Sequence, residues 1–171
     1  MLTTILAISS HHVVADDEAV LDLLQGYEWR LQEDRFRAMG PDAYKSLLNI
    51  ADDADRVNFI RARAARALTL YPNDVVWEFF EREITIGQDR IRRRQLVQNF
   101  CASFLRTRPD EVGLALMPLL KESDAHLRSS SARCLQKHDS ELSRDALASY
   151  RRMISDPWEL RAAGFSQEDS P

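Results

Sequence analysis

The chain has 171 residues and a net charge of −4, with 44% hydrophobic and 29% charged residues, which fits one folded domain and excludes wholesale disorder. Only 5 glycines and 6 prolines interrupt stretches rich in Ala, Leu, Arg and Glu, which excludes a sandwich or barrel of many short strands. The acidic balance argues against general coating of nucleic acid, because only residues 61–108 carry more bases (10) than acids (5).

Residues 1–15 form the first unit, an N-terminal arm. They contain an apolar run over residues 2–8 and end in Val13-Val14-Ala15, a small-residue pattern typical of a signal-peptide cleavage site. Because no Lys or Arg precedes the apolar run, the arm is a weak signal-peptide candidate, and we expect a cytoplasmic protein. If the arm is a signal peptide, the protein is periplasmic or secreted. No run reaches the roughly 18–20 apolar residues of a transmembrane helix, so no membrane span is expected.

Helical periodicity extends over residues 16–165, which we predict to be a single helical domain. A helix over residues 17–39 is expected to cap its open end, ahead of the break at Gly40. Helical hairpins are predicted to follow, because Pro, Asn and Asp residues mark short turns between the apolar-periodic segments. The predicted hairpins span residues 42–71, 74–107, 110–138 and 143–165, and the polar tail 166–171 is expected to be disordered.

The second helix of each predicted hairpin repeats one pattern. It opens on an Asp, at intervals of 34, 35 and 32 residues, and an Arg follows within the first two turns. In the first three hairpins, small or apolar residues occur three, four and seven positions beyond this Arg, which is one face of a helix with the Asp near its N-cap. The aspartates are Asp55, Asp89, Asp124 and Asp156, and the arginines are Arg61, Arg93, Arg128 and Arg161.

The frame Asp-x-x-Leu-Arg-x-x-x-Ala-x-x-Leu, clearest from Asp124 to Leu135, resembles the second helix of HEAT repeats. Residues 37–48 are similar to the opening of the HEAT-like repeats of phycobilisome lyases, and the likeness extends over residues 36–165. The resemblance implies an all-α, armadillo-like fold, an α-α superhelix in which hairpins stack as a short α-solenoid. It also implies a structural ladder, in which each Asp meets an Arg of its own or a neighbouring repeat.

Such repeats encode packing, so function has to be predicted from the surface. We predict a non-enzymatic scaffold or binding module whose partner is another protein, in particular an acidic segment; nucleic acid is not expected. The alternative is an enzyme or enzyme subunit, since the resemblance extends to bilin lyases and HEAT-like DNA glycosylases. The sequence has no nucleophile-elbow, phosphate-loop or metal-ligand motif, so no catalytic residue, metal or cofactor is predicted.

The candidate binding surface is a set of bases on the second helices. In HEAT-like stacks these helices line the concave face, where bases can hold an acidic peptide or a phosphate. The competing interpretation is that these bases form an ordinary solvent-exposed face, whose charge is offset by Glu78, Glu81 and Glu83 on the adjoining helix. Trp158 is a further candidate, because it starts the last helix, which no further repeat covers. The candidate bases are Arg63, Arg66, Arg90, Arg92, Arg94 and Arg133.

The two cysteines, Cys101 and Cys134, lie on predicted helices and lack the spacing of a zinc site. We expect buried thiols, since free cysteine is among the most buried residue types. Their separation is about one repeat, so a disulfide between adjacent hairpins is the minor alternative.

Overall fold

The computed structural model describes residues 17–138 and 140–166, and throughout these residues the regular structure is helical, which confirms the all-α prediction. The predicted arm or signal peptide, residues 1–15, and the tail after Ser166 lie outside the described residues. Within the described part, no helix combines the length and the apolar character that crossing a membrane requires.

The predicted capping helix over residues 17–39 is two helices rather than one, α1 (Asp17–Leu24) and α2 (Glu33–Ala38). The chain turns at Gly26, whose φ of 100° lies in the left-handed region that favours glycine. The indole Nε1 of Trp29 then donates to the Leu23 carbonyl at 2.8 Å, which fixes the connection against the end of α1. The prediction was wrong because the apolar residues on both sides of Gly26 keep a helical spacing across the turn.

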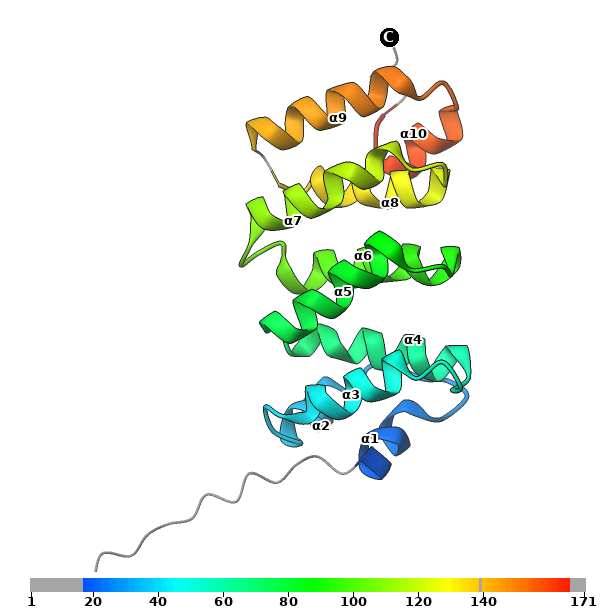
Figure 1. The fold of residues 1–171 in the computed structure, drawn as a ribbon, viewed down its shortest axis with the longest axis vertical. Coiled ribbons are helices and arrows are strands. Elements are labelled where there is room, and N and C mark those ends of the chain that lie inside the picture. Colours follow the sequence, from blue (N-terminus) through cyan, green and yellow to red (C-terminus); the bar gives the residue numbers. More distant parts are fainter. Residues whose placement is uncertain (1–16, 139, 167–171) are drawn as a thin grey trace, which may run out of the picture.

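Helical hairpins follow α2 and stack one on another along the long axis of the molecule (Figure 1). Within each hairpin the two helices run in opposite directions, and the second helix packs against the second helices of its neighbours. In chain order the elements are α3 (Ala43–Asp52), α4 (Asn58–Ala67), η1 (Leu68–Leu70), α5 (Asp74–Ile86), α6 (Arg90–Phe104), α7 (Pro109–Leu116), η2 (Met117–Lys121), α8 (Ala125–Leu135), α9 (Glu141–Met153) and α10 (Pro157–Ala163).

Aspartate side chains start three of the four second helices. Asp89, Asp124 and Asp156 each accept a hydrogen bond from the backbone N–H two residues further on, at 2.8 to 3.0 Å. These bonds satisfy N–H groups that have no partner inside the helix. Asp55 does not cap its helix, because α4 begins later and its cap position falls on Val57.

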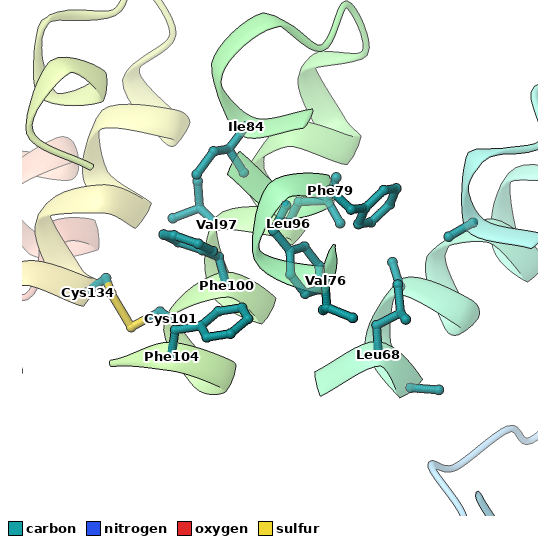
Figure 2. Packing of buried hydrophobic residues seen from close by; sticks show 14 of the residues in the cluster. Leu68, Val76, Phe79, Ile84, Leu96, Val97, Phe100, Cys101, Phe104 and Cys134 are labelled. Atoms are coloured by element: carbon teal, nitrogen blue, oxygen red, sulfur yellow. A yellow bond between two sulfur atoms is a disulfide. The ribbon is translucent and has the colours of Figure 1, made fainter. Parts of the chain in front are cut away.

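Aromatic rings fill the core between α5 and α6. The ring of Trp77 lies 4.6 Å from that of Phe100 and 5.0 Å from that of Phe104, measured between ring centroids. Phe80 completes this cluster, and all three phenylalanines are fully buried. Figure 2 shows Phe100 and Phe104 projecting from α6 toward the residues of the neighbouring helices.

Cys101 on α6 and Cys134 on α8 form a disulfide, so the expectation of free thiols is wrong and the alternative pairing is the one observed. Both residues are buried, as expected, with 6% and 3% of their surface exposed. Their Cα atoms lie 6.0 Å apart, because one repeat separates them in sequence and α6 packs directly against α8. The disulfide lies at the margin of the aromatic cluster (Figure 2).

Candidate functional site

Two arginines of the repeat pattern tie successive hairpins together. Arg93 donates from Nε to the Ile84 carbonyl at 3.0 Å and from Nη2 to Oε1 of Glu122 at 2.7 Å. One repeat later, Arg128 donates to the Glu122 carbonyl at 2.6 Å and to both carboxylate oxygens of Glu159 at 2.8 and 2.6 Å. Each arginine therefore binds the end of the preceding helix in its own hairpin and a carboxylate of the next hairpin.

This arrangement differs from the expected ladder of aspartate and arginine. In the described chain, no side-chain contact joins an Asp of the pattern to the Arg of its own segment, and the column's carboxylate partners are glutamates. Arg61 donates to the Ala51 carbonyl at 3.2 Å, and Arg161 is exposed. Asp89, Asp124 and Asp156 direct their oxygens at the first N–H groups of their own helices. Asp124 also meets two arginines of the neighbouring repeat, Arg90 and Arg94, which lie outside the predicted column.

The predicted binding bases of α6 have carboxylate partners within the fold. Arg94 donates from Nε and Nη2 to the two oxygens of Asp124, each at 3.0 Å, and Arg90 reaches the same carboxylate at 3.3 Å. Arg92 donates to Glu83 at 2.9 Å, and its side chain is only 13% exposed. These three arginines therefore join neighbouring helices, and Arg90, which shares Asp124 with Arg94 and keeps 68% of its side chain exposed, is the most open of them.

Asp124 is the centre of this ion-pair cluster. Its side chain is 7% exposed, and burial by itself would raise the pKa of the carboxyl group. Hydrogen bonds from Arg94, from the backbone of His126 and from Arg90 outweigh burial and hold the pKa of Asp124 below its usual range. Asp124 is therefore ionised at neutral pH and fixes the positions of both arginines.

Arg63 also makes contacts within the fold that hold two elements together. Its Nη1 donates to the Leu24 carbonyl at the end of α1, at 2.7 Å. Its guanidinium group lies 4.8 Å from the ring centroid of Phe59 and 5.4 Å from that of Trp29. Arg63 thus fastens α1 and the chain that follows it to α4, with cation–π contacts on its faces.

The remaining predicted bases border a groove of about 660 Å³ that runs across the second helices of all four hairpins. Arg66 of α4 and Arg133 of α8 line it and are exposed, and Lys137, just after α8, is a third exposed base. Among the described residues, none of these three cations forms an ion pair with a carboxylate, and no Asp or Glu lines the groove. Its other polar lining residues include Arg94, Gln98, His126, Ser129 and Ser130.

Trp158 stands beside this groove rather than at an isolated end of the stack. Its ring makes a T-shaped contact with the ring of His126, a groove residue, at a centroid distance of 4.5 Å. Trp158 remains 40% exposed, so its neighbours cover only part of it.

Sequence reasoning missed Lys137 and the position of the disulfide. Lys137 follows Arg133 by four residues, the spacing that places two side chains on the same helical face, so its signal was present. Cys101 and Cys134 also border the groove, which depends on how α6 lies against α8 and has no local sequence signal.

An apolar hollow of about 600 Å³ lies on the first-helix side of the last two hairpins. Leu114, Leu142 and Met153 line it and are half exposed, together with Lys121 and Asp145. Its two charges have opposite signs, so this hollow has no preference for a charged ligand.

Comparison with models of known protein families, with curated proteins and with solved structures finds no match to this chain. No group of three or more His, Cys, Asp or Glu residues in the described ranges is placed to hold a metal ion. The functional argument therefore depends on the charges and the shape of the surface described above.

Proposed function

We propose that the chain is a non-enzymatic interaction module, a short α-solenoid of HEAT-like repeats that holds an acidic segment of another protein in the groove of the second helices. The repeat character is supported by Arg93 and Arg128. Each makes the same two contacts, to the end of the preceding helix and to a carboxylate of the next hairpin, in successive hairpins.

The observation that carries this proposal is the difference between two sets of bases. Arg90, Arg92 and Arg94 have carboxylate partners within the fold, whereas Arg66, Arg133 and Lys137 have none among the described residues. Arg66 donates to the amide oxygen of Asn99 at 3.5 Å. A guanidinium group without a carboxylate partner can bind a carboxylate with two parallel hydrogen bonds, and such charge-assisted bonds are about twice as strong as neutral ones.

The overall charge of the chain restricts the partner. With a net charge of −4, the protein repels large polyanions at a distance, so attraction is confined to the groove. A short acidic stretch of a partner protein can occupy such a groove without bringing a uniform negative field against the rest of the surface. Gln98 and Ser130 can add hydrogen bonds to the backbone of an extended segment.

A titration of a fluorescent oligoglutamate peptide tests this proposal. We expect the wild type to bind the peptide with an affinity that falls as salt is added, because the contacts are exposed ion pairs. The triple variant Arg66→Glu, Arg133→Glu, Lys137→Glu should bind at least about tenfold more weakly, as expected for reversed charges in an interface. Reversal of Arg90, Arg92 and Arg94 is unsuitable, because it would strand Asp124 and Glu83 and destabilise the fold.

The matched control is Arg35→Glu, Lys121→Glu, Arg152→Glu, which changes the net charge equally at exposed bases outside the groove. Circular dichroism first establishes that all three proteins are folded. The control should bind the peptide within about twofold of the wild type, since distant surface charges are screened. Equal loss of binding in both variants would show that only net charge matters, and unchanged binding in the groove variant would refute the proposed site.

A further inference from the structure

The Cys101–Cys134 disulfide lies in the wall of the basic groove. Both cysteines border the groove, and the bond links the two helices, α6 and α8, that supply most of its lining. Figure 2 shows the sulfur atoms bridging these helices beside the aromatic cluster rather than within it. The disulfide therefore lies beside three bases that have no carboxylate partner among the described residues.

The surroundings of the bond favour negatively charged reactants. Arg66, Arg133 and Lys137 border the groove without carboxylate partners, and no acidic side chain among the described residues lines it. A concave surface lined by one sign of charge raises the local concentration of counter-ions. Nearby cations also stabilise a cysteine thiolate, which is the leaving group when a disulfide is opened.

From this juxtaposition we infer that the Cys101–Cys134 disulfide is a thiol-exchange site for small anionic thiols, which the groove bases Arg66, Arg133 and Lys137 attract to the bond. The inference depends on the charge of the groove and not on the binding of an acidic protein segment. The expected ligand is a thiol that carries a carboxylate or a sulfonate group and is small enough for a groove of about 660 Å³.

The reaction needs no oxidant or reductant other than the thiol. Its thiolate sulfur attacks Sγ of Cys101, which is the more exposed cysteine (6% against 3%), and a new S–S bond forms there. The bond from Cys101 to Cys134 breaks, and its electron pair leaves on Sγ of Cys134 as a thiolate. One thiolate enters and one is released, so charge and electrons balance.

The product is a mixed disulfide at Cys101 and a free thiolate at Cys134. The carboxylate or sulfonate of the bound thiol then lies among the groove bases, which stabilise the mixed disulfide relative to one formed with a neutral thiol. Attack by Cys134 on the mixed disulfide restores the original bond and expels the small thiol. The modification is therefore reversible, and it opens and closes the covalent link between α6 and α8.

Three thiols of similar size and different charge test the inference: 2-mercaptoethanesulfonate, 2-mercaptoethanol and cysteamine. Each reacts with the folded, oxidised protein at low ionic strength, the reaction is quenched with iodoacetamide, and the adducts are quantified by intact mass. Rates are divided by the rate of the same thiol with oxidised 2-mercaptoethanol, which removes differences in intrinsic reactivity. The anionic thiol should react about tenfold faster than the cationic one after this correction, as electrostatic attraction predicts.

The variant Arg66→Gln, Arg133→Gln, Lys137→Gln should lose most of this preference while the control Arg35→Gln, Lys121→Gln, Arg152→Gln retains it. Equal corrected rates for the three thiols in the wild type would overturn the inference. So would a preference that survives in the groove variant, or a disulfide that reacts only once the protein is unfolded. Failure of the oligoglutamate peptide to bind, with the thiol preference intact, would refute the proposed function alone.

Discussion

Arg94 and Asp124 are 30 residues apart in the chain and form a two-armed ion pair, with Nε to Oδ2 and Nη2 to Oδ1 each at 3.0 Å. The same carboxylate caps α8 by accepting from the backbone N–H of His126 at 3.0 Å. One side chain thus starts a helix and fixes that helix to the preceding hairpin, so local and long-range structure depend on the same residue.

Asp124→Asn should separate these two roles. Asparagine remains a good N-cap, so the helix start is kept, while the charge pairing with Arg94 is lost. We expect the free energy of unfolding to fall by about 1.5–3 kcal/mol, the range for hydrogen bonds to charged groups. Urea unfolding followed by circular dichroism measures the change, and an unaltered midpoint would show that the ion pair contributes nothing to stability.

The difference in unfolding free energy between the wild type and Asp124→Asn should depend on pH, because the pKa of Asp124 is lowered in the folded protein. In the unfolded chain an Asp titrates near its ordinary pKa of about 3.9, whereas in the folded protein it stays ionised to lower pH. The stabilisation is therefore complete above the unfolded pKa and is lost as pH falls through the folded pKa. The wild type and Asp124→Asn should differ by a constant amount above about pH 5 and converge in acid. A gap that persists at the lowest pH would contradict this origin.

Glu159→Gln should be one of the most destabilising single changes in the protein. Glu159 is 2% exposed, accepts two hydrogen bonds from Arg128, and accepts a third from the Tyr150 hydroxyl at 2.9 Å. Removal of one partner from a buried pair leaves an uncompensated charge and costs about 3–5 kcal/mol. The unfolding free energy in urea provides the measurement.

Tyr150→Phe is the matched control for Glu159→Gln. Burial and the hydrogen bond to Glu159 raise the pKa of Tyr150, so the hydroxyl is a neutral donor at physiological pH. Its loss removes one hydrogen bond while Arg128 and Glu159 remain paired, at a cost of about 1 kcal/mol. If both variants are equally destabilised, the ion pair is not the dominant interaction at this site.

Reduction of the disulfide should lower the stability of the folded state. The disulfide closes a loop between residues 33 positions apart in sequence. For such a loop the chain-entropy model gives a stabilisation of about 3–4 kcal/mol. Cys101→Ala, Cys134→Ala should show a similar decrease, and reducing agent should then have no further effect. Because cytosolic thiol pools keep cysteines reduced, protein from a reducing cytosol should carry two free thiols and unfold at lower temperature than the oxidised form.

Two glycines should respond in opposite directions to alanine. In α7, a Cβ added to Gly113 would lie 3.7 Å from Oγ of Ser143, an ordinary contact, so Gly113→Ala should stabilise by about 0.5–1 kcal/mol. At Gly87 the added Cβ would lie 2.3 Å from the Glu83 carbonyl oxygen, so Gly87→Ala should destabilise. Thermal unfolding compares the two, and stabilisation at Gly87 would contradict the packing at the end of α5.

Local sequence signals predicted the helical class and three of the four aspartate caps, because capping depends on residues two or three positions apart. The break at Gly26 was missed, since hydrophobic spacing continues across it and only the backbone conformation reveals the turn. From the sequence, the disulfide is the minor alternative to free thiols. Periodicity placed Cys101 and Cys134 one repeat apart, but pairing also requires the contact between α6 and α8.

The candidate site was predicted as a set of arginines. The sequence could not show which of them are paired with carboxylates and which are exposed in the groove. Whether an arginine is free depends on which carboxylate the next hairpin brings near it, as Asp124 is brought to Arg94. Arg92 and Arg133 look alike in sequence, yet one is paired with Glu83 and the other is exposed in the groove. Long-range packing determines this distinction, and sequence spacing alone cannot.

The most direct measurement for the account is photo-crosslinking of an oligoglutamate peptide that carries a central benzophenone, followed by mapping of the crosslinked residues by mass spectrometry. We expect crosslinks on α4, α6 and α8, around Arg66, Gln98 and Arg133, and their loss in excess unlabelled peptide or in the groove variant. Crosslinks concentrated on α9 and η2, around the apolar hollow at Leu142 and Met153, would show that the module binds its partner through a different face.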